Sequence, residues 1–354
     1  MSSSAPGTVR SGHVSGLHAV TSALAEMRGS ILKAGVDDGG GMRLSVLTLV
    51  VACADRASGE RAGEVLERMA VSHPTRAIVL VGDPDGPARI DADVSISCST
   101  TGGGQVCMEM VRLEVGGGSA RHLRSVVGPL LLPDVPVHLW VVEAAPLTQA
   151  LSPDTFELCE RVILDSDAYP DPTATLVAVA QATTAVRPAP AIGDLAWSRI
   201  RGWRELAGRA FETPELRGFV QGVEDVEVRF AGTVPSAQAL LFSGWLRSRL
   251  DRPGFLMPAI TRIPDGREGG HGELQRVVLR ASNRGRRARI EISGDETLRT
   301  TAVSVEGAMH STAATWTVGV EQPGIVALVG AELEEQGPDP MYTAALAAAL
   351  GESR

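Results

Sequence analysis

The first half of the chain alternates between apolar runs and segments with helical periodicity. Residues 43–53 and 76–81 are nearly continuous apolar runs, as expected for strands that are covered on both faces of a parallel sheet. Between them, residues 60–71 carry apolar side chains at helical spacing. A strand, a helix and a second strand joined by short connections predict a right-handed parallel unit.

The pattern continues along the chain on both sides of this unit. Further apolar runs predict strands at 94–98, 106–115, 137–142 and 162–164, with short helices at 120–127 and 155–160. An amphipathic helix is predicted at 17–33, before a glycine-rich break. We therefore expect a peripheral helix in residues 1–39 and a three-layer, Rossmann-like α/β domain with a mostly parallel sheet in residues 40–185.

A proline-rich segment separates this domain from the rest of the chain. Residues 186–191 (VRPAPA) contain two prolines, each of which removes a backbone donor and restricts the residue before it. We interpret residues 186–193 as a linker. Residues 194–354 are then expected to form a mixed α/β domain with antiparallel strands.

The second domain has its own helix and strand signals. Asp194 is predicted to cap a helix that extends to Phe211. Alternation of apolar and polar residues predicts strands at 226–230, 277–280 and 288–292, and periodicity predicts helices at 236–250 and 341–350. Residues 282–285 (SNRG) supply the asparagine and glycine of a tight turn between two of these strands.

Composition places the chain of 354 residues among globular proteins, with 44% hydrophobic and 21% charged residues. With 33 basic and 42 acidic residues, the formal net charge is −9, which argues against an extended nucleic-acid surface. Aromatic residues make up only 4%, which leaves few platforms for stacking bases. The most apolar stretch, residues 44–54, is about half the ~20 residues that a membrane span requires. We expect neither a nucleic acid nor a membrane as partner.

The four cysteines, Cys53, Cys98, Cys107 and Cys159, are scattered and form no C-x-x-C pair. A chain of this length does not need disulfides to fold, so the cysteines fit a reducing compartment. The N-terminus has no basic region followed by an apolar run, and we read no signal peptide there. These observations predict a cytoplasmic protein.

Most signatures of catalysis or cofactor binding are absent from the sequence. We find no H-E-x-x-H, no G-x-S-x-G, and no G-x-G-x-x-G after the first predicted strand. Lys33 is the sole lysine and lies outside any phosphate-binding loop motif. The histidines have no metal-ligand spacing. We therefore expect no catalytic residue, no cofactor and no metal.

Two weaker signals allow a functional or a structural interpretation. Residues 116–119 (GGGS) join a predicted strand to a helix, where free amides could bind a phosphate, although glycine runs more often mark turns. Arg284, Arg286, Arg287 and Arg289 crowd a predicted hairpin, where guanidinium groups could bind a phosphate or the carboxylates of a partner. Such hairpin tips are often merely solvated.

The remaining titratable residues are weaker indications of catalysis. His73 precedes a proline at a strand entrance and fits a loop or cap residue better than a general base. Asp91 with Asp93, and Asp165 with Asp167, are candidate carboxylate pairs, but both pairs lie at strand ends where aspartate is common.

Two longer stretches resemble a known family. Residues 129–140 (PLLLPDVPVHLW) and 194–206 (DLAWSRIRGWREL) resemble signature stretches of the OpcA family, the glucose-6-phosphate dehydrogenase assembly proteins. Four further stretches fit the family in the same order: 73–76 (HPTR), 161–166 (RVILDS), 238–250 and 338–342 (PDPMY). The chain departs from the family pattern at 141–143 (VVE) and at His138, which replaces an apolar residue.

The resemblance implies a non-catalytic protein that binds and activates glucose-6-phosphate dehydrogenase. Within the most specific stretch, the candidate partner-binding residues are Trp197, Arg199, Trp203 and Arg204, followed by the hairpin residues Arg284, Arg286 and Arg287. The tryptophans have a second explanation, because tryptophan is largely buried wherever it occurs. Two alternatives remain: an enzyme or sugar-phosphate- or nucleotide-binding protein that uses the sheet edge of the first domain, and a purely structural scaffold.

Overall fold

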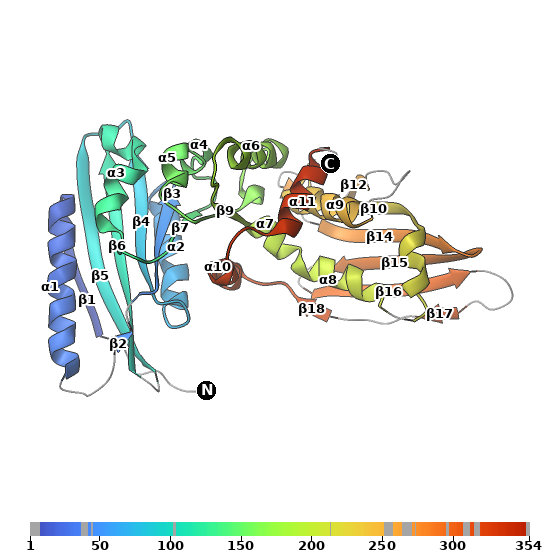
Figure 1. Cartoon of the computed structure of the whole chain (residues 1–354), viewed down its shortest axis with the longest axis horizontal. Coiled ribbons are helices and arrows are strands. Elements are labelled where there is room, and N and C mark those ends of the chain that lie inside the picture. Colours follow the sequence, from blue (N-terminus) through green and yellow to red (C-terminus); the bar gives the residue numbers. More distant parts are fainter. Residues whose placement is uncertain are drawn as a thin grey trace. The chain divides into compact units, whose positions relative to one another are not determined.

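The computed structural model describes residues 8–36, 42–43, 45–101, 104–212, 214–250, 258–263, 271–272, 274–294, 297–306, 312–314 and 319–351. These fold into two compact units, each with its own sheet (Figure 1). Unit 1 comprises Met1–Asp165, Ala182–Gly193 and Ile325–Gly337, and unit 2 comprises Ser166–Gln181, Asp194–Gly324 and Pro338–Arg354. The units therefore exchange chain segments, which a division at residues 186–193 does not anticipate.

The sheet of unit 1 has nine strands in the order β1-β5-β6-β4-β3-β7-β8-β9, with β2 paired to β6. Their bounds are β1 (Thr8–Ser15), β2 (Met42–Arg43), β3 (Leu47–Cys53), β4 (Thr75–Asp83), β5 (Arg89–Thr101), β6 (Gly104–Gly116), β7 (Val137–Val141), β8 (Arg161–Leu164) and β9 (Ala191–Asp194). Strands β6, β4, β3, β7 and β8 pair in parallel, whereas β1 and β5 are antiparallel to their neighbours. The predicted mostly parallel sheet is confirmed.

Helices cover both faces of this sheet. On β4, Arg76 faces α1 (Leu17–Val36), since it shares the carboxylate of Glu109 with Arg28 of that helix. The alternate residue Val79 faces α2 (Arg56–Met69), where a Cβ added to Gly59 would lie 3.6 Å from its side chain. Because successive side chains of a strand point to opposite faces, α1 and α2 lie in different layers. The predicted three-layer architecture is confirmed.

The remaining helices of unit 1 are α3 (Leu123–Val127), α4 (Leu147–Ala150), α5 (Pro153–Phe156) and α10 (Ile325–Glu334). Helix α6 (Pro172–Ala185) contains the division between the units and ends just before the predicted linker, in which Arg187–Pro188 is a cis peptide. Short 3₁₀ helices lie at Gly117–Arg121, Gly128–Leu130, Ser166–Ala168 and Arg217–Gly222. Helix α1 is packed on the sheet, with Val20 and Leu24 buried.

Unit 2 contains a seven-stranded sheet in the order β12-β10-β14-β15-β16-β17, with β18 paired to β16, and a small β11–β13 pair. The bounds are β10 (Val223–Ala231), β11 (Val234–Pro235), β12 (Ala259–Ile263), β13 (His271–Gly272), β14 (Leu274–Asn283), β15 (Arg286–Gly294), β16 (Thr297–Glu306), β17 (Thr312–Ala314) and β18 (Gly319–Glu321). Apart from the β10–β12 pair, the pairs of this seven-stranded sheet are antiparallel, as predicted.

The helices of unit 2 are α7 (Leu195–Arg199), α8 (Arg201–Ala210), α9 (Ala237–Arg249) and α11 (Pro340–Ala349). Helices α9 and α11 lie side by side (Figure 1), and a Cβ at Gly244 of α9 would come within 2.1 Å of the carbonyl oxygen of Ala345 in α11. Glycine at this position therefore permits the close approach of the two helices.

The strands of this sheet are two-faced. On one face the side chains are apolar and buried, as in Val226, Val228, Val277, Leu279, Ile290 and Ile292. The other face carries alternating charges, in which Arg229 binds Glu227 and Arg276 binds Glu291. Because the described helices α8 and α9 contact the same strands, the apolar face is the one that they cover.

Candidate functional site

The buried carboxylate of Asp194 joins three of the stretches that carry the family resemblance. It accepts hydrogen bonds from the backbone N–H of Ala196 at 3.0 Å, which confirms Asp194 as a helix cap, and from the hydroxyl of Ser166 at 2.7 Å. The phenol of Tyr342 donates to the same carboxylate at 3.2 Å. Residues that are far apart in the sequence therefore meet at one buried acceptor in unit 2.

Trp197 continues this network toward the start of α11. Its indole Nε1 donates to Asp339 at 2.8 Å, and its ring lies 5.9 Å from that of Tyr342. Asp339 also caps α11 by accepting from the N–H of Met341. The guanidinium of Arg204 lies 3.5 Å from the Trp197 ring centre, within cation–π range. We call these residues, with Asp194, Ser166 and Tyr342, the aspartate-tryptophan network.

The network changes the electrostatics of Arg204. Burial lowers the pKa of Arg204 to about 10, and the nearby carboxylate of Asp339 opposes this shift. The guanidinium therefore remains a cation at neutral pH, held between an aromatic ring and an acid. Such an arrangement stabilises the local fold and leaves part of the arginine surface accessible, since Arg204 is half-buried.

The structure places the predicted partner-binding residues of this segment at different depths. Trp197 is 4% exposed and Trp203 is fully buried, whereas Arg199 and Arg204 are half-buried. The predicted single helix over 194–211 is interrupted at Ile200, which separates α7 from α8. Each tryptophan packs inward from its own helix, so the arginines form the accessible part of the segment.

A second motif stretch is tied to the same unit through Asp167. Its carboxylate accepts from the backbone N–H of Ala237 at 2.5 Å and from the side-chain amide of Gln238 at 2.9 Å, at the start of α9. By sequence Asp167 is half of a candidate carboxylate pair, but in the structure it binds a helix N-terminus. This is a structural role for the residue.

The predicted hairpin brings three of the arginines to one end of unit 2. Strands β14 and β15 are joined by only two residues, Arg284 with φ 49° and Gly285 with φ 78°. Both angles are positive, as in a type I′ turn, and an L-residue in this region costs about 1 kcal/mol. Arg284, Arg286 and Arg287 are exposed at this turn, which we name the arginine tip.

In unit 1 the resembling stretch 129–140 covers a buried ion cluster. Arg76 donates to Glu109 at 2.7 Å and to the carbonyl oxygen of Leu130 at 2.7 Å. Arg28 of α1 donates to the same carboxylate at 2.9 Å. One acid thus accepts from two arginines, which fixes α1 and the 129–140 loop to the sheet.

A second buried ion pair fastens α10 to the sheet of unit 1. Arg161 on β8 contacts Glu332 on α10 at 3.0 Å and donates to the carbonyl oxygen of Gly337 at 2.7 Å. The side chains are 4% and 9% exposed. His138 on β7 lies opposite Arg161 on β8. Burial, together with the charge of Arg161, lowers the pKa of His138 to about 4.

The first glycine of the 116–119 run has a structural role. A Cβ at Gly116 would lie 2.0 Å from the carbonyl oxygen of Pro87, so this glycine serves a close approach of two backbone segments. Beside the run is an open cavity of about 450 Å³, lined by Leu17, Ile90, Gly118, Ser119, His122, Ser125 and Val126. This lining combines apolar and hydroxyl-bearing side chains with one imidazole.

At the carboxyl edge of the parallel strands, the described polar groups bind one another. Arg61 donates two hydrogen bonds of 2.7 Å to Glu143, and Asp55 caps α2 together with Ser58. Burial, assisted by Glu143 and Asp55, raises the pKa of Cys53 to about 12. Its thiol therefore stays protonated and unreactive at neutral pH.

The other titratable candidates lie apart from one another. His73 lies against Gly330 of α10, 3.9 Å from Glu334, which fits a packing residue. Asp91 and Asp93 accept from Ser15 and His13 on the edge strand β1.

Among the described residues no group of three His, Cys, Asp or Glu side chains could hold a metal. None of the described helices has the length and apolar character to cross a bilayer.

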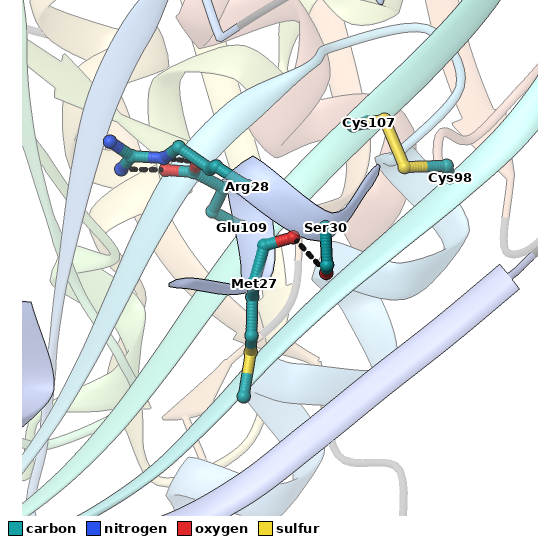
Figure 2. The surroundings of a disulfide bond; sticks show 6 residues. All are labelled: Met27, Arg28, Ser30, Cys98, Cys107 and Glu109. Carbon is teal, nitrogen blue, oxygen red and sulfur yellow. Dashed lines mark hydrogen bonds and ion pairs between the residues drawn. A yellow bond between two sulfur atoms is a disulfide. The ribbon is translucent and has the colours of Figure 1, made fainter. Parts of the chain in front are cut away.

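The chain contains a disulfide that the sequence pattern does not predict. Cys98 and Cys107 lie opposite each other on the antiparallel strands β5 and β6, with Cα atoms 4.1 Å apart, and their sulfurs are bonded (Figure 2). The expectation that the cysteines need no disulfide is wrong for this pair, because the β5–β6 register brings together residues whose spacing resembles no motif. Figure 2 also shows Met27 and the Arg28–Glu109 pair nearby.

Comparison with known families agrees with the motifs. Residues 66–181 match the family model described as the N-terminal domain of a glucose-6-phosphate dehydrogenase subunit, OpcA type. Residues 190–346 match the model described as the C-terminal domain of the same subunit. Together the two matches take in most of the chain.

Curated relatives point the same way. A protein of Synechococcus elongatus is 29% identical over 236 residues, which is 66% of this chain and 50% of the relative, and one of Synechocystis is 28% identical over 189 residues, 52% and 39%. Both carry the provisional description OxPP cycle protein OpcA. The chain thus spans half or less of the length of these relatives. With both of its halves matched by the two domain models of one family, the chain belongs to the OpcA family.

Proposed function

We propose that the protein is a non-catalytic assembly factor that binds glucose-6-phosphate dehydrogenase and raises its activity. The observation that carries this proposal is the match of both halves to domains described as those of a dehydrogenase subunit. A protein that controls the first oxidative step of the pentose phosphate route would act on cytoplasmic NADPH supply. We also propose a cytoplasmic location, although the Cys98–Cys107 disulfide removes the cysteine argument for it.

The fate of the shared motifs supports a binding role. Several polar side chains of the resembling stretches bind other parts of the same chain, as in Trp197 with Asp339 and Arg161 with Glu332. Side chains used in this way hold the fold together rather than form a reaction centre. The accessible arginines beside them are the groups that a partner would meet.

The proposal is tested by mixing the purified chain with the cognate dehydrogenase. We expect the two to co-elute and NADP⁺ reduction to become faster at micromolar concentrations. The absence of both effects would contradict the proposal. Calorimetry of the isolated chain with glucose 6-phosphate, 6-phosphogluconate and NADP⁺ checks the alternative, since strong binding there would favour a ligand-binding protein. A complex without any rate change would indicate a scaffold.

We infer that the α7–α8 segment supplies part of the docking surface. Arg199 and Arg204 would contact the partner, while Trp197 and Trp203 hold the segment from inside. If Arg204 is a major contact, its replacement by alanine weakens the complex by ~2 kcal/mol, about thirtyfold. The buried tryptophans behave differently, because truncation to alanine costs ~3 to 5 kcal/mol of folding stability.

Affinity and unfolding midpoint are therefore measured on the same variants. Arg209→Gln is the matched control, since Arg209 is exposed on α8 and paired with Glu205. Full affinity of Arg199→Gln and Arg204→Ala, with the fold intact, would remove this segment from the docking surface.

A further inference from the structure

The turn at the arginine tip holds a residue that its backbone disfavours. Two-residue hairpin loops with positive φ at both positions select asparagine, aspartate or glycine at the first position. Here Arg284 occupies that position with φ 49°, followed by Gly285, which adopts φ 78° without a steric penalty. Backbone energy therefore does not explain the arginine. Strain of this kind is characteristic of positions whose side chain is used.

The charges along the hairpin are graded from its body to its tip. In the body, Arg280 pairs with Asp225 and Glu227, and Arg289 pairs with Glu291 at 2.6 Å. At the tip, Arg284, Arg286 and Arg287 are exposed, and none has an ion pair among the side chains that the structure describes. The described acids that pair with this hairpin therefore lie along its body, and the three arginines at the tip have no such partner among them.

The backbone behind the arginine tip is firmly packed. The 3₁₀ helix Arg217–Gly222 lies against the end of β14, where a Cβ at Gly222 would come within 1.6 Å of the carbonyl oxygen of Ser282. Phe219 of this helix is 1% exposed, and the guanidinium of Arg286 lies 5.9 Å from the centre of its ring. A partner would therefore bind a preorganised backbone and pay little ordering entropy.

The chemistry of the tip selects an acidic partner. Guanidinium groups bind carboxylates in planar, two-pronged geometry. The chain as a whole has a net charge of −9, so a polyanion such as a nucleic acid is repelled at long range, whereas a folded protein with one acidic patch is not. We infer that the arginine tip docks on an acidic surface of the dehydrogenase, an inference that rests on the proposed function.

The decisive variant is Arg284→Asn, which removes one charge and supplies a residue that the turn prefers. We expect its unfolding midpoint to equal or exceed that of the wild type, while its complex with the dehydrogenase is weaker by about threefold to tenfold in ~50 mM salt. The triple variant Arg284→Asn, Arg286→Gln and Arg287→Gln should weaken the complex by about thirtyfold or more. In ~0.5 M salt, where charges are screened within a few ångströms, the difference in affinity between the wild type and the triple variant should shrink severalfold.

The control is Arg121→Gln in unit 1, an exposed arginine that is paired with Asp85 and should leave affinity unchanged. If the wild type binds and the triple variant binds equally well, the inference is overturned and the proposed function stands. If the wild type forms no complex, both are overturned. A lower unfolding midpoint for Arg284→Asn than for the wild type also overturns the inference. So does binding of the wild type to a ~30-base-pair DNA duplex that the triple variant loses, if the triple variant still binds the dehydrogenase fully.

Discussion

The guanidinium of Arg204 lies 3.5 Å from the ring centre of Trp197, on the indole whose N–H is bound to Asp339. The two contacts fix the indole ring between Arg204 and Asp339, two residues that lie far apart in the sequence. The start of α11 is thereby attached to the segment between α7 and α8. The stretch 194–206 is therefore a junction within unit 2.

Replacement of Asp339 by alanine should lower the free energy of unfolding by about 2 to 4 kcal/mol, because the change removes a helix cap and leaves a buried indole N–H unpaired. Asp171→Ala is the matched control: Asp171 caps α6 alone, so the loss should be about 1 kcal/mol. Urea unfolding followed by tryptophan fluorescence measures both. Equal losses in the two variants would show that the indole contact adds nothing.

Removing one partner of the Arg161–Glu332 pair should lower the free energy of unfolding strongly, whereas replacing both partners by apolar residues should lower it much less. Glu332→Leu leaves a buried guanidinium without its acid and should destabilise the protein by about 3 to 5 kcal/mol. Adding Arg161→Met should restore more than half of that loss, because two apolar side chains need no charge compensation. Thermal unfolding of the single and double variants tests this. Additive losses of stability in the double variant would contradict a coupling between Arg161 and Glu332. The control is Asp85→Ala, which breaks the exposed Arg121–Asp85 pair and should change the free energy of unfolding little.

Acid should destabilise the protein through His138. The imidazole takes up a proton near pH 6.5 in the unfolded chain, whereas burial and Arg161 lower its pKa to about 4 in the folded protein. Between these values the unfolded chain binds more protons, so the stability contributed by His138 is complete above pH 6.5 and is lost as the pH falls toward 4. The loss amounts to about 3 kcal/mol.

The variant His138→Leu, which replaces the buried imidazole by an apolar side chain, should flatten this part of the pH profile. Unfolding midpoints measured from pH 7 down to 4.5 give the comparison. Parallel profiles for the wild type and the variant would assign the acid sensitivity to other groups.

The thiols should divide into two classes. Protein purified without reductant and then denatured should show two titratable thiols per chain, from Cys53 and Cys159, and four after reduction. In the folded state at pH 8 alkylation should be slow, since burial raises the pKa of both free thiols to about 12. Loss of the disulfide, which closes a loop across nine positions, should cost about 2 to 3 kcal/mol. Four thiols before reduction would refute the pairing.

Local chemistry made several features predictable. The β3–α2–β4 unit follows from two apolar runs around one helical period, and the Asp194 cap from its place before an apolar segment. The tight turn follows from Gly285, although Arg284 and not Asn283 takes the first turn position. In each case the signal lies within a few residues of the structure it specifies. The family resemblance, carried by longer stretches, was equally accessible.

Features that depend on distant partners were not predictable. Strand β1 (TVRSGHVS) has little apolar alternation and exists through its antiparallel pairing with β5. Asp339 lies 142 residues from Trp197, and the disulfide depends on the register of a hairpin. The break at Ile200, which turns one expected helix into two, lets both tryptophans point inward although their spacing on a single helix would separate them.

The exchange of segments between the units has a consequence for biosynthesis. Glu332 follows Arg161 by 171 residues, and α10 belongs to the first unit although almost the whole second unit is synthesised before it. While the chain leaves the ribosome, β8 must therefore wait with an uncompensated arginine until the segment Ile325–Gly337 emerges. The N-terminal unit is completed late, and a premature stop after residue 324 would damage both units at once.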